Sequence, residues 1–244
     1  MKAQRRRELK SNSLIWHLQG LPEKIKQYQS QISLVVILLA LGVVLIQYRM
    51  RTAAERLDAA QNGVALATEN LARLRQMGMP EHNGDLFMKE REDFYAEGVE
   101  QADEALQKAP DNQPQLKAHA LLAKGDLSYE MANFPELPGA ATQPALRPSE
   151  STDDLLSAAS DAYTQALQTY GDVPNVAVAA RFGLAAVAED RGQWDAARDQ
   201  YQAIIASDAA QPYKDYAKTR LDILPQLQQP AAMDLGPATQ PTTR

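Results

Sequence analysis

The sequence predicts an all-α protein, in which a single N-terminal transmembrane helix precedes an α-solenoid of about three helix pairs and a C-terminal capping helix. Three observations predict this class. An uncharged run, ISLVVILLALGVVLI, occupies positions 32–46. Beyond it, apolar residues recur with helical period as far as Gln228, and alternating β-branched runs are absent from the sequence. Charge also divides the chain: residues 1–51 carry nine Lys or Arg and two acids, net +7, whereas residues 52–244 carry 16 and 29, net −13.

Composition excludes several kinds of chemistry. The 244 residues include no cysteine, so disulfides, thiol nucleophiles and Cys-ligated metal sites are impossible. The three histidines, His17, His82 and His119, are far apart and lack a metal-ligand spacing. No phosphate-binding glycine loop and no Gly-x-Ser-x-Gly motif occurs in the sequence. We therefore expect no enzyme activity, no cofactor and no metal site.

The uncharged run predicts a transmembrane helix over residues 28–48. A helix of that length spans roughly 31 Å, which matches a hydrocarbon core of about 30 Å. Tyr28 and Tyr48 fall where aromatic belts form, and basic residues lie just outside them. The alternatives, a buried core helix or a cleaved signal peptide, fit less well, because apolar residues cover every face and no small-residue cleavage site follows.

The basic segment 1–27 sets the predicted orientation. Seven Lys or Arg precede the span and three follow closely, so the positive-inside rule places the N-terminus in the cytoplasm and the remaining chain outside it. The cluster from Lys2 to Lys10 is typical of either a nucleic-acid patch or a lipid contact. We favour a topology determinant that rests on anionic headgroups, and we expect no nucleic-acid partner.

A juxtamembrane helix is predicted over residues 49–78, continuing the span outward. Apolar residues recur there with 3-4 spacing. They are Met50, Ala53, Leu57, Ala60, Val64, Ala67, Leu71 and Leu74. A homodimeric coiled coil through residues 50–74 is one interpretation. Because three of the eight positions are Ala and Gly63 lies among them, we favour a helix packed against its own domain.

The clearest motif begins at Gly192, with the sequence GQWDAARDQYQAII. Small residues before and within it allow two antiparallel helices to approach, the glycine permits a turn, and aromatic residues fill the gap to the next helix. On a 34-residue frame, eight residues take packing positions: Leu184, Ala185, Ala188, Gly192, Trp194, Ala197, Tyr201 and Ile204. The block resembles the tetratricopeptide repeat (TPR) family, and this resemblance implies a TPR-like helical domain over residues 79–228.

A second, interrupted copy precedes this one. Residues 121–129 look like a first helix with its small residue at Gly125, and Ala159 and Tyr163 fall at second-helix positions, followed by Ala166 and Leu167. Between the two helices, residues 133–152 contain four prolines among small polar residues. This composition predicts a flexible Pro-rich insertion.

A third and weaker copy has small residues at Gly98 and Ala102 and ends near Ala105, and its first helix would be the juxtamembrane one. The intervals between copies are irregular. After the last repeat, an apolar stripe within residues 213–224 predicts a helix that caps the solenoid. The proline-containing tail, residues 229–244, is predicted to be disordered.

The TPR resemblance implies a concave surface made by first helices, where extended peptides or partner helices bind. On this frame the candidate partner groove comprises Leu122, Asp126, Tyr129, Glu130, Phe182, Glu189 and Asp190. Family members that clamp a C-terminal carboxylate carry Lys, Arg and Asn there, whereas this chain carries acids and apolar residues. We therefore expect a protein partner of basic and apolar character. The alternative is that these residues only solvate the groove.

The layout from about Gln27 to Gln228 resembles the bacterial inner-membrane family of ancillary subunits of the SecYEG translocon. That resemblance implies a single-pass inner-membrane protein whose periplasmic domain contacts translocon subunits, chaperones or emerging chains. Two other interpretations stay open. One is an envelope-biogenesis scaffold for cell-wall or outer-membrane machinery, and the other is an inverted TPR receptor that faces the cytoplasm.

Overall fold

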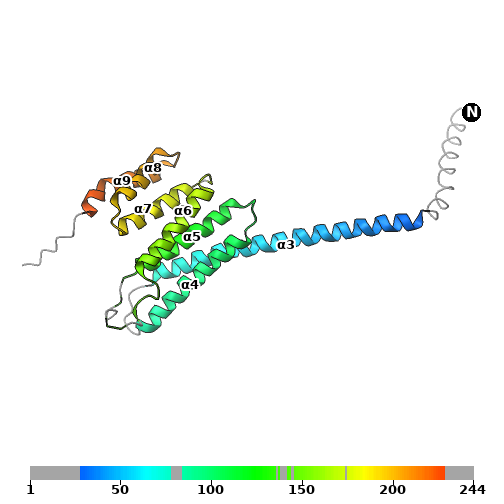
Figure 1. The fold of residues 1–244 in the computed structure, drawn as a ribbon, viewed down its shortest axis with the longest axis horizontal. Helices are drawn as coiled ribbons and strands as arrows, with labels where there is room; N and C mark the ends of the chain where they lie inside the picture. The colour runs from blue at the N-terminus through cyan, green and yellow to red at the C-terminus, as the bar shows by residue number, and fades with distance from the viewer. Residues whose placement is uncertain are drawn as a thin grey trace, which may run out of the picture. The chain divides into compact units, whose positions relative to one another are not determined.

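A computed structural model describes residues 28–77, 84–135, 137, 142–143, 146–173 and 175–228. Within these ranges the chain forms seven helices, α3 to α9, and no strand, which confirms the all-α expectation (Figure 1). The predicted basic segment 1–27, with its lipid-contacting cluster, and the predicted tail 229–244 lie outside the described residues. Two compact units divide the chain, residues 1–55 and residues 56–244, and each is described by itself.

The first unit contains the beginning of α3 (Gln29–Gln76) and with it the uncharged run. The large apolar side chains from Leu34 to Ile46 are each 53–65% exposed, so this part of the helix has no protein partner of its own among the described residues. Of the helices described, α3 is the one that is long and apolar enough to cross a membrane. Its 48 residues exceed the roughly 20 needed for a span, as expected of a helix that continues outward.

In the second unit, the end of α3 packs against α4 (Gly84–Lys108) and α5 (Pro114–Ala132). Ala67, Leu71 and Leu74 are buried in one cluster with residues of both helices. At Gly63 an added Cβ would lie 2.8 Å from the carbonyl oxygen of Gln101, so only a glycine permits this approach. The favoured expectation, a helix packed against its own domain, therefore describes α3 from Ala60 to Leu74, whereas Met50 and Ala53 of the predicted stripe are exposed. The homodimer stays a prediction.

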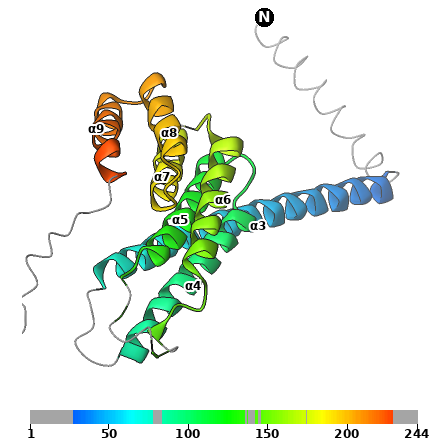
Figure 2. The same ribbon diagram turned by 60° about the vertical axis from the view of Figure 1, so that its left-hand side comes forward.

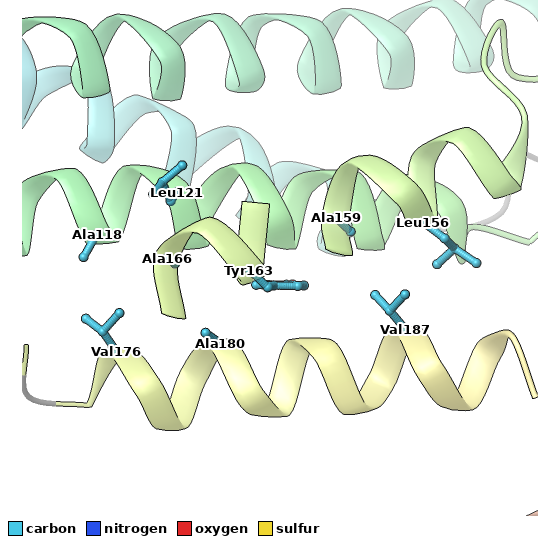
Figure 3. Close-up of a cluster of buried hydrophobic side chains, with 9 residues drawn as sticks. All are labelled: Ala118, Leu121, Leu156, Ala159, Tyr163, Ala166, Val176, Ala180 and Val187. Carbon is cyan, nitrogen blue, oxygen red and sulfur yellow. The ribbon is translucent and has the colours of Figure 1, made fainter. Parts of the chain in front are cut away.

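Helices α5, α6 (Thr152–Tyr170) and α7 (Val176–Asp190) follow one another side by side around the main hydrophobic core (Figures 1 and 2). In Figure 3, Val176, Ala180 and Val187 of α7 point toward the labelled residues of α5 and α6. Ser151 caps α6, since its hydroxyl accepts a hydrogen bond from the amide of Asp154 at 3.1 Å. Asp153 and Asp154 occupy the first turn, where carboxylates complement the helix dipole.

Tyr163 of α6 lies between α5 and α7 and is 2% exposed (Figure 3). Its ring takes the space that side chains would need at two glycines. A Cβ added to Gly125 of α5 would lie 2.6 Å from the ring, and one added to Gly183 of α7 would lie 2.4 Å from it. These distances are far inside van der Waals contact, so the absence of a side chain at both positions lets three helices meet around one aromatic residue.

The last helices are α8 (Trp194–Ala206) and α9 (Gln211–Leu227), and each packs on the helix before it. Gly192 stands in the turn between α7 and α8 with a φ of 67°, a left-handed conformation that favours glycine. The other proposed repeat-packing residues are distributed as follows: Ala185, Ala188, Ala197, Tyr201 and Ile204 are buried in one cluster, Trp194 packs against it, and Leu184 packs against the main core. In α9, Ala217 and Leu224 of the predicted apolar stripe are buried.

The described part of the 133–152 insertion is anchored to α4, which the sequence analysis missed. Leu137 and Leu146 are 4% and 6% exposed, and both pack against Met88. The amide of Ser149 donates to the carboxylate of Glu92 at 2.7 Å. Leucines in a Pro-rich stretch carry no periodic signal, so sequence alone gave no reason to bury them.

Replacing Gly183 with alanine should destabilise the second unit by about 1–3 kcal/mol, because the new methyl group overlaps the Tyr163 ring. Denaturant unfolding of the detergent-solubilised full chain measures this loss. Gly42→Ala, where an added Cβ meets no atom within 4 Å, is the matched control and should lose nothing. In a Tyr163→Leu background the cost of Gly183→Ala should shrink. An unchanged cost there would show that the ring is not the obstacle.

Candidate functional site

The candidate partner groove lies on α5 and α7, which are neighbours although α6 separates them in sequence. Asn133, at the end of α5, joins the two helices. Its side-chain amide donates to the carboxylate of Asp190 at 2.7 Å and to the carbonyl oxygen of Tyr129 at 3.2 Å. The structure therefore brings Tyr129 and Asp190 together.

Asp126 faces inward from α5 rather than toward solvent. The hydroxyl of Tyr163 donates a hydrogen bond to its carboxylate at 2.6 Å. Burial raises the pKa of the Asp126 carboxyl, although this hydrogen bond and the nearby Arg75 act in the opposite direction. Burial and the same carboxylate raise the pKa of the Tyr163 phenol. Asp126 thus orients a core tyrosine.

The other two polar residues that α5 contributes are half-buried. Burial raises the pKa of the Tyr129 phenol, and the adjacent carboxylate of Asp190 raises it further. Glu130 pairs with Arg75 of α3, with 3.4 Å between a carboxylate oxygen and Nε. Leu122 packs against the main core. Only part of this surface is therefore available to a partner.

Glu189, which directly precedes Asp190 at the end of α7, connects three helices. Its carboxylate accepts a hydrogen bond from the Tyr201 hydroxyl of α8 at 2.6 Å and forms an ion pair with Arg220 of α9. The side chain of Glu189 is only 10% exposed. A buried carboxylate with two donors is held in place, so Glu189 stabilises the α7–α8–α9 packing.

Phe182 belongs to an aromatic cluster that includes exposed rings of α9. Its ring centroid lies 5.3 Å from that of Tyr216 and 6.4 Å from that of Tyr213, and Tyr201 completes the cluster at 6.2 Å. Tyr213 and Tyr216 are 41% and 56% exposed. Neither tyrosine was predicted to belong to the site, although both extend its apolar surface onto α9.

The candidate groove contains four carboxylates, and two of them form ion pairs with cations. Arg75 and Arg220 are the cations, and they come from α3 and α9. Neither could be predicted from the sequence, because no local spacing links them to α5 or α7. The surface keeps an acidic excess, with Asp190 as its exposed carboxylate.

Within the described ranges, no group of three or more His, Asp or Glu side chains is arranged to hold a metal ion. His119 is exposed on α5. What the described site can do chemically is form hydrogen bonds, ion pairs and aromatic contacts with another molecule.

Comparison with known proteins returns no match among family models, curated proteins or solved structures.

Replacing Asp126 with asparagine should raise the free energy of unfolding above that of the wild type. The difference should be larger at neutral pH than in acid. The carboxyl pKa is higher in the folded state than the ordinary 3.8, so the folded protein binds more protons and wild-type stability falls as pH rises through this window. Asparagine does not titrate, and its amide oxygen can still accept from Tyr163. Denaturant unfolding at pH 4 and pH 7 measures the difference.

Tyr163→Phe is the companion variant for this test. It removes the donor that lowers the pKa of Asp126, so its loss of stability between pH 4 and pH 7 should exceed that of the wild type. Equal pH profiles for wild type, Asp126→Asn and Tyr163→Phe would contradict the assignment of Asp126 as a buried, titrating carboxyl.

Proposed function

We propose that this chain is a membrane-anchored, TPR-type protein-interaction scaffold. Its apolar N-terminal helix crosses the bacterial inner membrane once, and its helical domain binds polypeptides on the extracytoplasmic side, in association with the protein translocon or periplasmic chaperones. The face formed by α5 and α7 is the binding surface.

The observation that carries this proposal is the pairing of α5 with α7 across α6. Antiparallel helix pairs that stack as repeats place their first helices beside one another, and partner molecules bind along that row. Here α6 packs on both α5 and α7, α8 packs on α7, and Asn133 bridges α5 to Asp190. This order of contacts is the one that repeat stacking predicts.

The expected partner follows from the side chains on this face. Acids exceed cations, and half-buried Leu122 and Phe182 lie on α5 and α7 with the exposed tyrosines of α9 beyond them. A segment with Lys or Arg beside apolar residues would complement this surface. Because Glu189 is bonded to Arg220 and Tyr201, it would support binding of such a partner by holding the helices in place. Glu130 and Asp190 are the carboxylates that a partner can reach.

The orientation rests on the Lys and Arg bias around the apolar run. Reporter fusions after Gln228 test it. A reporter active only outside the cytoplasm should be active, and one active only inside should be silent. The matched control replaces Arg5, Arg6 and Arg7 with glutamine, which should weaken the preference. The opposite pattern would establish the inverted receptor that faces the cytoplasm.

Site-specific photocrosslinking in intact membranes tests the binding face. A photoreactive residue at Asp190 should yield a crosslinked polypeptide, and one at Asp161, exposed on α6, should not. Glu130→Gln in the Asp190 background should reduce the yield several-fold, because it removes a carboxylate that a basic partner meets. Glu97→Gln, an exposed substitution on α4, is the matched control and should change little.

The identity of the captured chain separates the two extracytoplasmic interpretations. Translocon subunits or chaperones support the proposed process, whereas cell-wall or outer-membrane assembly enzymes favour the envelope scaffold. Equal yields at Asp190 and Asp161 would contradict a binding face on α5 and α7.

A further inference from the structure

A strip of three side chains runs along the exposed side of α7. Phe182, Ala186 and Asp190 follow one another at intervals of four residues, so they share one face of the helix. Phe182 and Ala186 are half-buried, and Asp190 is exposed. At about 1.5 Å per residue, Phe182 and Asp190 are about 12 Å apart along the helix axis. The strip therefore has an aromatic end and an acidic end at a fixed separation, with a small residue between them.

The aromatic end continues onto α9. The Phe182 ring meets the Tyr216 ring edge-on, at an interplanar angle of 63°, and it meets the Tyr213 ring at a tilt. Five large apolar side chains are exposed in the described part of the second unit, and three of them, including both tyrosines, lie on α9. A capping helix normally turns a polar surface outward. Exposed rings gathered around a half-buried phenylalanine are instead typical of an anchor point for a partner's aromatic side chain.

The acidic end has a carboxylate that is not neutralised by a cation. Among the described residues, Asp190 accepts a hydrogen bond from the neutral amide of Asn133 and takes part in no ion pair. Glu189, the residue before it, is already paired with Arg220. Asp190 is therefore the position on this strip where a cationic side chain of a partner would gain most from charge complementarity.

We propose that the strip binds an extended polypeptide segment in which a Lys or Arg lies about four residues from an aromatic side chain. The aromatic side chain packs on the rings of Phe182 and Tyr216, and the cation pairs with Asp190. This inference rests on the proposed scaffold function and deepens it, because it fixes the order and the spacing of the side chains that a partner must carry.

The dimensions of the strip favour an extended chain. Four residues of polyproline II conformation span about 12 Å, which is the separation of Phe182 and Asp190 along α7. A helix with its side chains is about 10–12 Å across. The strip is the exposed side of a single helix, with Asn133 bonded to one end of it and Tyr216 packed on the other. An extended chain can lie along such a strip and reach both ends.

Acetylated and amidated peptides test the spacing. Each carries Phe and Lys separated by one, three or seven prolines, which places them about 6, 12 or 25 Å apart, and a matched peptide has glutamine in place of Lys. Both sequence orders are measured. Ligand-observed NMR with the full chain in nanodiscs of neutral lipid gives the dissociation constants, and empty nanodiscs correct for binding to lipid. With three prolines, Lys should tighten binding about two- to fivefold over glutamine in at least one order, as expected of an exposed ion pair. With one or seven prolines, the Lys and glutamine peptides should bind equally.

Two substitutions test the two ends of the strip. Asp190→Asn should remove the advantage of Lys, whereas Asp161→Asn, which changes an exposed carboxylate on α6, should preserve it. Tyr216→Ala should weaken the Lys and glutamine peptides alike by several-fold, and Tyr216→Phe, which keeps the ring, should not. Leu66→Ala, which shortens an exposed apolar side chain on α3, is the matched control for Tyr216→Ala.

Three results would overturn the inference: an equal advantage of Lys at all spacings, an advantage that survives Asp190→Asn, or no saturable binding of the three-proline peptides. If a polypeptide is still crosslinked at Asp190 in intact membranes, the scaffold proposal stands and only the spacing is wrong. If that crosslink is also absent, both proposals are wrong.

Discussion

The helical stack depends on the contact between the Tyr163 ring and the two glycines that face it. Because Gly125 and Gly183 lack a Cβ, α5 and α7 can both approach a ring from α6, and the Asp126 carboxylate fixes the direction of the phenol. The pairing of α5 with α7 follows from this arrangement. So does the position of the candidate binding face, since its residues come from those two helices. Packing and site geometry therefore share one cause.

In the proposed scaffold, the acids of that face would serve the fold as well as a partner. Asp126 and Glu189 each accept a tyrosine hydroxyl, and Arg75 and Arg220 neutralise part of the charge. At Glu130, a basic segment would therefore exchange with an existing ion pair instead of meeting a bare carboxylate. Such an exchange would add little affinity, because half-exposed ion pairs contribute little binding free energy. It would add more selectivity, because the acids repel segments that carry negative charge.

Local patterns in the sequence predicted the helices, because periodicity, small residues and a turn glycine such as Gly192 act within one helix pair. They also predicted the small residue at Gly125. The match between Tyr163 and Gly183 could not be predicted, since it joins residues of successive pairs whose spacing varies. Arg220 is distant from Glu189 in sequence for the same reason. Arg91 lies in an acidic stretch typical of a solvated helix, and nothing local indicates that it is buried.

The two buried leucines of the insertion affect the entropic cost of the connection between α5 and α6. A free linker from Ala132 to Thr152 would have to close over its whole length, with an entropic cost that grows with the logarithm of that length. Leu137 and Leu146 anchor it to Met88, which divides one long closure into shorter ones. The length that enters the closure cost is thereby the spacing between anchors along the sequence, and not the whole distance from Ala132 to Thr152.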